Sequence, residues 1–245
     1  MTFGITVARV AAVGPAEPAP DCPRCPRLID FRDACRLRDP SGYNAPVRSF
    51  GEVSARLLIV GLAPGRDGAN HSGRPFTGDW AGDLLYETLS DCGLASGRYD
   101  ERPDDSLGLV DCMVTNAVRC VPPGNKPLPS EIATCREFLI ARMAELSRLQ
   151  IVVALGRVAH DSVVRALGLR LAAVPFVHGR AHALQFRGRD LSLFDSYHCS
   201  RYNTNTGVLT PEMFRSVFSS VRDLLDGTSG DGMHRFGPVA HQPSE

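Results

Sequence analysis

Four of the eight cysteines have positions that suit a metal centre. Cys22 and Cys25 form a C-x2-C pair beside prolines that keep the backbone extended, and fourteen residues separate Cys120 from Cys135. Four thiolates can hold either a zinc ion or an iron–sulfur cluster. Zinc ribbons usually carry two short pairs, so one short and one long pair favours a cluster only slightly and leaves both metals open. The remaining cysteines suit ordinary buried positions: Cys35, Cys92, Cys112 and Cys199.

A glycine-rich loop over residues 61–82 follows an apolar run at 57–60, which predicts a short buried strand. The loop contains six glycines and two prolines, and the residues after Asp79 predict a helix. Glycines let backbone N–H groups approach an anion or a planar base closely. The loop has neither the G-K-[ST] of a P-loop nor the G-x-G-x-x-G of a dinucleotide site. Its length and polar content indicate a functional loop rather than a plain turn.

Four side chains in this loop or at later strand ends could take part in binding or catalysis. The face of Phe76 could stack on a base, with a core position as the alternative. The amide of Asn116 offers one acceptor and two donors that could read a base edge, with a turn or cap role as the alternative. His198 could donate to a developing oxyanion, or be satisfied by the backbone. Asp79 could orient water or stabilise positive charge, although it also suits a helix N-cap.

Strands and helices alternate along the chain, which predicts an α/β fold with a mostly parallel sheet covered on both faces. Right-handed crossovers would bring the ends of the first, second and fourth strands to one rim. The loop after residue 61, Asn116 and His198 should therefore lie together. The expected strands are 57–60, 109–116, 150–155 and 191–197, and the main helices are 79–89, 129–146, 157–167 and 211–225.

Composition indicates a globular chain of 245 residues with 22% charged residues and no net formal charge. The apolar runs are too short to span a bilayer, and no signal peptide is recognisable, so we expect a cytoplasmic protein. Balanced charge argues neither for nor against an anionic partner. We expect a flexible lead-in over residues 1–20, one domain over 21–226 and a disordered tail over 227–245.

Six motifs together resemble the type-5 uracil-DNA glycosylases, the B-type, iron–sulfur branch of the uracil-DNA glycosylase superfamily. They are G-L-A-P-G, G-R-P-F-T-G-D, T-N-A-V-R-C-V-P-P-x-N-K-P, A-L-G-R, H-G and S-Y-H-x-S-R-x-N-T-x-T-G. The resemblance runs from about residue 22 to residue 225. It implies a three-layer α/β/α sandwich around a central four-stranded parallel sheet. It also implies a [4Fe-4S] cluster on Cys22, Cys25, Cys120 and Cys135, which decides against zinc.

The resemblance further implies roles in binding and excising a flipped base. Phe76 would stack on the base, Asn116 would read its Watson–Crick edge, and His198 would face the carbonyl oxygen that gains charge. Gly61 and Ala63 would line the pocket. The implied DNA-contacting loop comprises Ser200, Arg201, Tyr202 and Asn203.

Two positions depart from the best-known uracil-specific branch. Ala63 matches the catalytic aspartate of that branch, so we assign water activation to Asp79, with Asp67 and His71 as reserves. Gly65 matches the bulky residue that excludes thymine, which suggests a roomier pocket for uracil and for hypoxanthine, xanthine or ethenocytosine.

The expected protein is a monomeric, monofunctional DNA glycosylase that initiates base-excision repair on DNA with deaminated bases. Lys126 is the only lysine and lies in a proline-rich loop, so nothing marks a nucleophile for strand cleavage. The alternatives are a non-catalytic iron–sulfur protein that binds damaged DNA and a zinc-stabilised binding domain.

Overall fold

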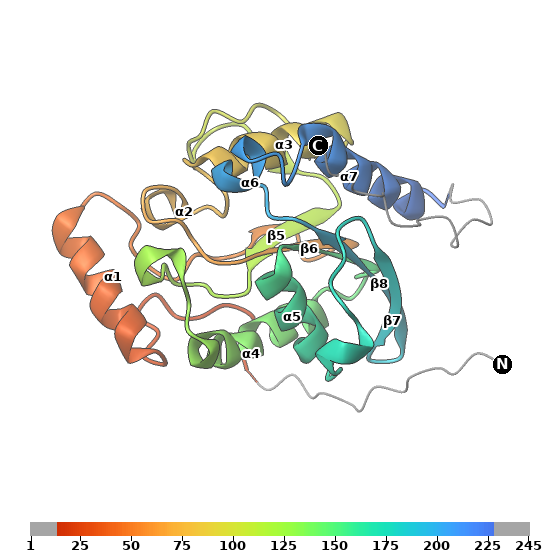
Figure 1. Cartoon of the computed structure of the whole chain (residues 1–245). Coiled ribbons are helices and arrows are strands. Elements are labelled where there is room, and N and C mark those ends of the chain that lie inside the picture. Colours follow the sequence, from red (N-terminus) through yellow and green to blue (C-terminus); the bar gives the residue numbers. More distant parts are fainter. Residues whose placement is uncertain (1–13, 228–245) are drawn as a thin grey trace, which may run out of the picture.

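The computed structural model describes residues 14–227 and shows an α/β protein built on one six-stranded sheet (Figure 1). The four central strands are parallel and follow the order β5-β2-β6-β8. An antiparallel strand flanks each side, β1 next to β5 and β7 next to β8. The strands of this sheet are β1 (Phe50–Gly51), β2 (Leu57–Gly61), β5 (Cys112–Asn116), β6 (Ile151–Leu155), β7 (Ala181–Phe186) and β8 (Arg189–Ser196).

The expected central parallel sheet of four strands is present, and two antiparallel edge strands that the sequence did not predict extend it to six. β1 has two residues, too few for a periodic signal. β7 alternates between exposed and partly buried residues and therefore lacks an apolar run. A two-residue turn, Arg187-Gly188, joins β7 to β8, and both residues have positive φ, as in the turns typical of hairpins.

The second expected strand, 109–116, is also divided. β4 (Gly108–Leu109) pairs with β3 (Ala95–Ser96) in a separate two-stranded sheet. β5 begins only at Cys112, after Asp111, whose φ of +55° interrupts the extended backbone. A residue in this left-handed region ends regular strand pairing.

Helices cover both faces of the main sheet and complete a three-layer α/β/α arrangement (Figure 1). Leu57 and Ile59 of β2 belong to the core shared with α3 and α7, whereas Leu58 and Val60 belong to the core under α4 and α5. This alternation follows from the two-residue period of a strand. The α-helices among residues 14–227 are α1 (Pro26–Arg38), α2 (Ala69–Ser72), α3 (Trp80–Asp91), α4 (Pro129–Glu145), α5 (Arg157–Ala166), α6 (Arg201–Asn205) and α7 (Pro211–Leu225).

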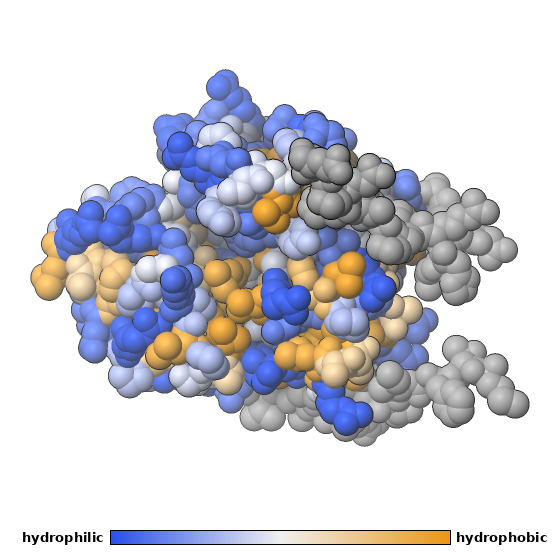
Figure 2. All heavy atoms as spheres, in the orientation of Figure 1, coloured by the Kyte–Doolittle hydropathy of each residue, from blue (hydrophilic) through white to orange (hydrophobic). Residues whose placement is uncertain are grey.

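The expected main helices are all present, and prolines in the first turn begin α1, α4 and α7. Among the described residues, every helix is too short or too polar to cross a membrane. Figure 2 shows apolar atoms gathered on the visible face between α1 and α5, with polar residues around them.

The expected lead-in and tail fall largely on residues 1–13 and 228–245, outside the described part of the chain. The portion that is described, residues 14–20, contacts the domain through Glu17. The carboxylate of Glu17 accepts hydrogen bonds from Arg119 Nη1 at 3.0 Å and the backbone N–H of Ser49 at 3.0 Å, and it pairs with Arg142. Arg119 is only 1% exposed, so this ion pair is buried.

Candidate functional site

The carboxyl ends of the parallel strands form one rim, as the sequence predicted. Gly61 ends β2 and lies opposite Asn116 at the end of β5. His198 follows β8 by two residues, and its ring is stacked with that of Phe76 at a centroid distance of 5.8 Å and an interplanar angle of 25°. Side chains from three separate chain segments therefore meet at this rim.

Gly61 allows two of these side chains to approach closely. A Cβ atom at this position would lie 2.4 Å from Oδ1 of Asn116 and 2.5 Å from Cζ of Phe76. Both distances are far below van der Waals contact, so any other residue would displace the amide and the ring. Asn116 and Phe76 are buried at 3% and 6% exposure. No hydrogen-bonding partner of the Asn116 amide is found among residues 14–227, which leaves its polar atoms available to a ligand.

His198 is a neutral histidine at neutral pH. Burial lowers the pKa of its imidazole to about 4, because the charged ring would lose its hydration. Its backbone carbonyl accepts a hydrogen bond from Nδ2 of Asn203 at 2.8 Å, which ties the strand end to α6. A neutral imidazole can donate one hydrogen bond to an oxygen that gains negative charge.

Asp79 caps α3, as the sequence suggested: Oδ1 accepts the backbone N–H of Ala81 at 3.1 Å. The glycine-rich loop wraps its other oxygen, since a Cβ atom on Gly65 or Gly68 would lie 3.1 Å or 2.6 Å from Oδ2. Burial raises the pKa of this carboxyl above its ordinary value, and the backbone N–H groups of α3 only partly offset the effect. A partly buried carboxylate with a raised pKa suits proton transfer or charge stabilisation.

Asp67 and His71, the alternatives to Asp79 for water activation, lie in exposed ion pairs. Asp67 accepts two hydrogen bonds from its neighbour Arg66, and His71 contacts Asp39 at 2.5 Å. Ala63 packs with the apolar residues around the cysteines.

The expected DNA-contacting loop forms α6, beside the start of α3. Ser200 caps this short helix, and Arg201 and Tyr202 are exposed. Trp80 is the residue here that sequence reasoning missed. Its indole N–H donates to Thr204 at 3.1 Å, and the guanidinium of Arg201 lies 5.6 Å from its ring. The single tryptophan of the chain, directly after a candidate catalytic aspartate, was the available signal.

A groove of about 500 Å³ extends from this rim over the start of α5. Arg157 lines it together with Phe176, and the guanidinium lies 5.3 Å from that ring. His178 and Tyr197 stack in its wall at 4.8 Å and 6°. Aromatic faces beside an arginine suit a nucleic-acid strand.

A second candidate site is formed by the four cysteines that the spacing singled out. Cys22 and Cys25 precede α1, Cys120 lies in the loop after β5, and Cys135 lies on α4. All four line one small apolar cavity. Burial and the neighbouring cysteines raise the pKa of Cys120 to about 12 and that of Cys135 to about 11, so these thiols require a cation to lose their protons.

The arrangement fits an iron–sulfur cluster better than a single zinc ion. Zinc would hold its sulfur ligands about 3.8 Å apart, yet within residues 14–227 no three of these sulfurs lie within 4.8 Å of one another. The backbone N–H of Arg119 donates to Sγ of Cys135 at 3.3 Å, a contact that suits a thiolate ligand. Arg32 also lines the cavity, and its buried Nε has no partner among the described residues. An unpaired cationic donor suits an anionic cluster.

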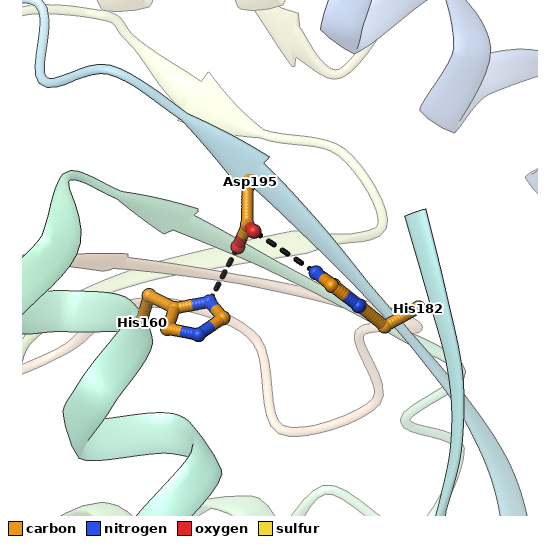
Figure 3. Close-up of side chains that lie close together, drawn as sticks. All are labelled: His160, His182 and Asp195. Carbon is orange, nitrogen blue, oxygen red and sulfur yellow. Dashed lines mark hydrogen bonds and ion pairs between the residues drawn. The ribbon is translucent and has the colours of Figure 1, made fainter. Parts of the chain in front are cut away.

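A third polar group, His160, His182 and Asp195, was not anticipated (Figure 3). Figure 3 shows dashed lines from the carboxylate of Asp195 to both rings. Its oxygens lie 2.6 Å from Nδ1 of His160 and 3.0 Å from Nε2 of His182. Ligands of one zinc ion would lie about 3.3 Å apart, so these distances indicate hydrogen bonds rather than a metal site. The residues come from α5, β7 and β8, and no sequence spacing relates them.

This group fixes the segment beside His198. Nε2 of His160 lies 2.8 Å from the carbonyl of Val174, so both ring nitrogens face oxygen atoms. Burial disfavours the charged ring, but the hydrogen bond and charge of Asp195 outweigh it and raise the pKa of His160. Asp195 also accepts the N–H of Val177 at 3.0 Å.

Comparison with known proteins agrees with the geometry. The profile of the Uracil DNA glycosylase superfamily matches residues 48–222. The type-5 uracil-DNA glycosylase of Thermus thermophilus is 45% identical over 179 residues, 73% of this chain and 80% of the relative. The type-5 enzyme of Mycobacterium leprae is 38% identical over 205 residues, 80% of this chain and 88% of the relative. That of Pyrobaculum aerophilum is 37% identical over 177 residues, 72% of this chain and 75% of the relative.

The matched region includes the whole rim, from the glycine-rich loop to α6. The chain therefore belongs to the uracil-DNA glycosylase superfamily, within its type-5 family.

Proposed function

We propose that this protein is a monofunctional DNA glycosylase that removes uracil from DNA and so initiates base-excision repair. The observation that carries the proposal is the rim on which Phe76, Asn116 and His198 meet with unpaired polar atoms. The names of the related proteins support uracil as the base.

The proposed reaction begins with extrusion of the target nucleotide, because a base inside a duplex is out of reach. Extrusion costs a few kcal/mol and costs least for mispaired bases. The flipped base would then lie against the ring of Phe76, and the amide of Asn116 would bond to its Watson–Crick edge. A buried asparagine and a buried ring suit this task, since their surroundings already hold them in place and keep them out of bulk water.

Cleavage of the N-glycosidic bond leaves an anionic base and a cationic sugar. Neutral His198 would donate to the base oxygen that gains charge, and donors placed in this way contribute about 3 kcal/mol each. The carboxylate of Asp79 would stabilise the sugar cation or orient the attacking water.

DNA would be held by Ser200, Arg201 and Asn203 around α6, with the groove beyond His198 receiving the strand. Arg201 is exposed and stacked on Trp80, so its charge is presented to solvent. A basic, aromatic surface of this kind suits a phosphate backbone next to unstacked bases.

The four cysteines would hold a [4Fe-4S] cluster. Through these thiolates, a bound cluster would link α1, the loop after β5 and α4. The loop after β5 begins directly at Asn116, so its position bears on the base pocket.

Substrates beyond uracil are part of the proposal. Gly65 has no side chain next to Asp79, which leaves room for larger bases such as hypoxanthine, xanthine and ethenocytosine. Lys126 is the only lysine of the chain, and it is exposed in the loop after β5, so an abasic site is the expected product.

The decisive experiment is base release from duplexes containing uracil or hypoxanthine. We expect wild type to release both bases and Asn116→Ala to release uracil about 100-fold more slowly, as expected for the loss of a key transition-state contact. Glu52→Gln, an exposed carboxylate outside the rim, is the control. Binding without release of any base would support the non-catalytic alternative, and uracil release without hypoxanthine release would refute the broad specificity.

Metal analysis tests the proposed cluster separately. Purified wild type should be brown and contain iron and sulfide, whereas a zinc protein would be colourless. Cys135→Ser should lose the iron, and Cys112→Ser should retain it, because Cys112 is equally buried but donates to the carbonyl of Leu94 instead. Equal iron content in both variants would contradict the assigned ligands.

A further inference from the structure

Phe76 has an unusual backbone conformation for an aromatic residue. Its φ is +54°, in the left-handed region that is unfavourable for any residue with a Cβ atom. A residue stays in this region only when its surroundings hold it there, and such residues cluster at functional sites. Neighbouring groups must therefore hold Phe76 in this conformation.

Two tyrosine hydroxyls bind the backbone on either side of the ring. The hydroxyl of Tyr86 donates to the carbonyl of Pro75 at 2.5 Å. The hydroxyl of Tyr99 donates to the carbonyl of Phe76 at 3.2 Å and accepts the N–H of Gly78 at 3.3 Å. These bonds fix the peptide groups before and after Phe76, which determines the direction of its side chain.

The buried guanidinium of Arg74 also binds this turn. Nη1 and Nη2 of Arg74 both donate to the carboxylate of Asp105 at 2.7 Å, and Nε donates to Oγ1 of Thr77 at 2.7 Å. The guanidinium also lies 5.7 Å from the ring of Tyr86 and 5.7 Å from that of Tyr99. Arginine suits this position because its planar fork can bind a carboxylate and stack on rings at the same time.

Asp105 connects this arrangement to the polar segment before β4. Its carboxylate is fully buried and accepts the backbone N–H groups of Asp100 at 2.9 Å and Leu107 at 3.1 Å. The segment thus folds around one carboxylate, and that carboxylate orients Arg74.

Helix α3 adds a close contact on the other side. A Cβ atom on Gly82 would lie 1.9 Å from the carbonyl oxygen of Phe76, so the first turn of the helix presses against this peptide group. Asp79 caps the same turn. The position of Phe76 is consequently coupled to that of the candidate catalytic carboxylate.

We propose that Tyr86, Tyr99 and the Arg74–Asp105 pair are positioning residues that hold the ring of Phe76 at the base pocket. This inference rests on the proposed function of the rim. None of the four touches the base; they act on catalysis through the backbone of Phe76.

Tyr99→Phe tests the proposal because it removes one hydroxyl and leaves the ring. We expect single-turnover release of uracil to fall about 3- to 10-fold, the equivalent of losing about one hydrogen bond, with little change in duplex affinity. Tyr43→Phe is the matched control, since that hydroxyl donates to Pro46 at 3.4 Å, outside this turn. An unchanged rate in Tyr99→Phe would contradict the proposal.

A double-mutant cycle separates positioning from a general loss of stability. If Tyr99 acts through Phe76, Tyr99→Phe should have no further effect on the rate in a Phe76→Leu background. A purely structural role predicts that the two effects multiply. Multiplicative effects would therefore overturn the proposal even if Tyr99→Phe slows the enzyme.

A crystal structure gives a readout that does not depend on activity. In Tyr86→Phe/Tyr99→Phe, with folding verified by circular dichroism, Phe76 should leave the left-handed region or lose its stacking on His198. A ring and backbone unchanged in that variant would refute the positioning role, whether or not the protein releases bases. Failure of wild type to release any base would refute the proposed function alone.

Discussion

Asp79 and Asp195 are carboxylates near the rim, the first partly buried and the second fully buried, and their surroundings differ. Among residues 14–227, Asp79 accepts hydrogen bonds only from backbone N–H groups at the start of α3, and burial raises its pKa. Asp195 accepts hydrogen bonds from His160, His182 and Val177, which outweigh burial and lower its pKa. A buried charge whose hydrogen bonds are satisfied costs the fold little, whereas a poorly satisfied one costs stability and suits a ligand or a transition state.

The largest effect on stability is expected from Asp195→Asn. The substitution leaves the buried His160 without its carboxylate, and breaking a buried ion pair typically costs about 3–5 kcal/mol. Chemical denaturation should report a loss of this size. Asp190→Asn, on the same strand but exposed, is the control. A loss below about 1 kcal/mol would show that Asp195 contributes little to the stability of the fold.

Asp79→Asn should have the opposite effect on stability and should slow base release. Asparagine caps helices as well as aspartate does, so the fold should be retained, and removal of a partly buried charge with a raised pKa should increase the melting temperature. Base release should fall about 100-fold, the usual effect of losing a key electrostatic contact. A variant that is less stable yet fully active would reverse the assignment of the two carboxylates.

His198, just after β8, and His160, on α5, should give slopes of opposite sign when the free energy of unfolding is plotted against pH. His198 has a pKa of about 4 when folded and about 6.5 when unfolded, so stability falls as pH drops below about 6.5. His198→Gln should remove up to about 2 kcal/mol of this loss between pH 7 and pH 5.

His160 has a raised pKa, so its contribution to stability is present below about pH 6.5 and is lost as pH rises through the folded value. His160→Gln should therefore remove the loss of stability that accompanies a rise in pH through the folded pKa of His160. Unfolding free energies of both variants at pH 5, 7 and 9 would test this, and slopes of the same sign would contradict the assigned protonation states.

The sequence was most informative where a short segment determines its own structure. Apolar runs located the four parallel strands, and the capping pattern at Asp79 located the start of α3. Strand-end reasoning also brought Asn116 and His198 to one rim, because parallel strands share a direction.

The sequence did not predict contacts between distant segments. Asp195 meets His160 across 35 positions, and Arg74 meets Asp105 across 31, with no motif that relates either pair. The polar strand β7 was missed because its outer residues face solvent. The left-handed φ of Phe76 was likewise unpredictable, because neighbouring side chains rather than local preference maintain it.

The ion pairs of Glu17 have a practical consequence for any shortened form of this protein. A chain that began at residue 21 would keep every cysteine and every rim residue, yet it would leave the guanidinium groups of Arg119 and Arg142 buried without their shared carboxylate. Arg119 is the residue between Val118 and Cys120, in the segment that leads from Asn116 to the cysteines. Removal of residues 14–20 would thus disturb the segment that connects the two sites.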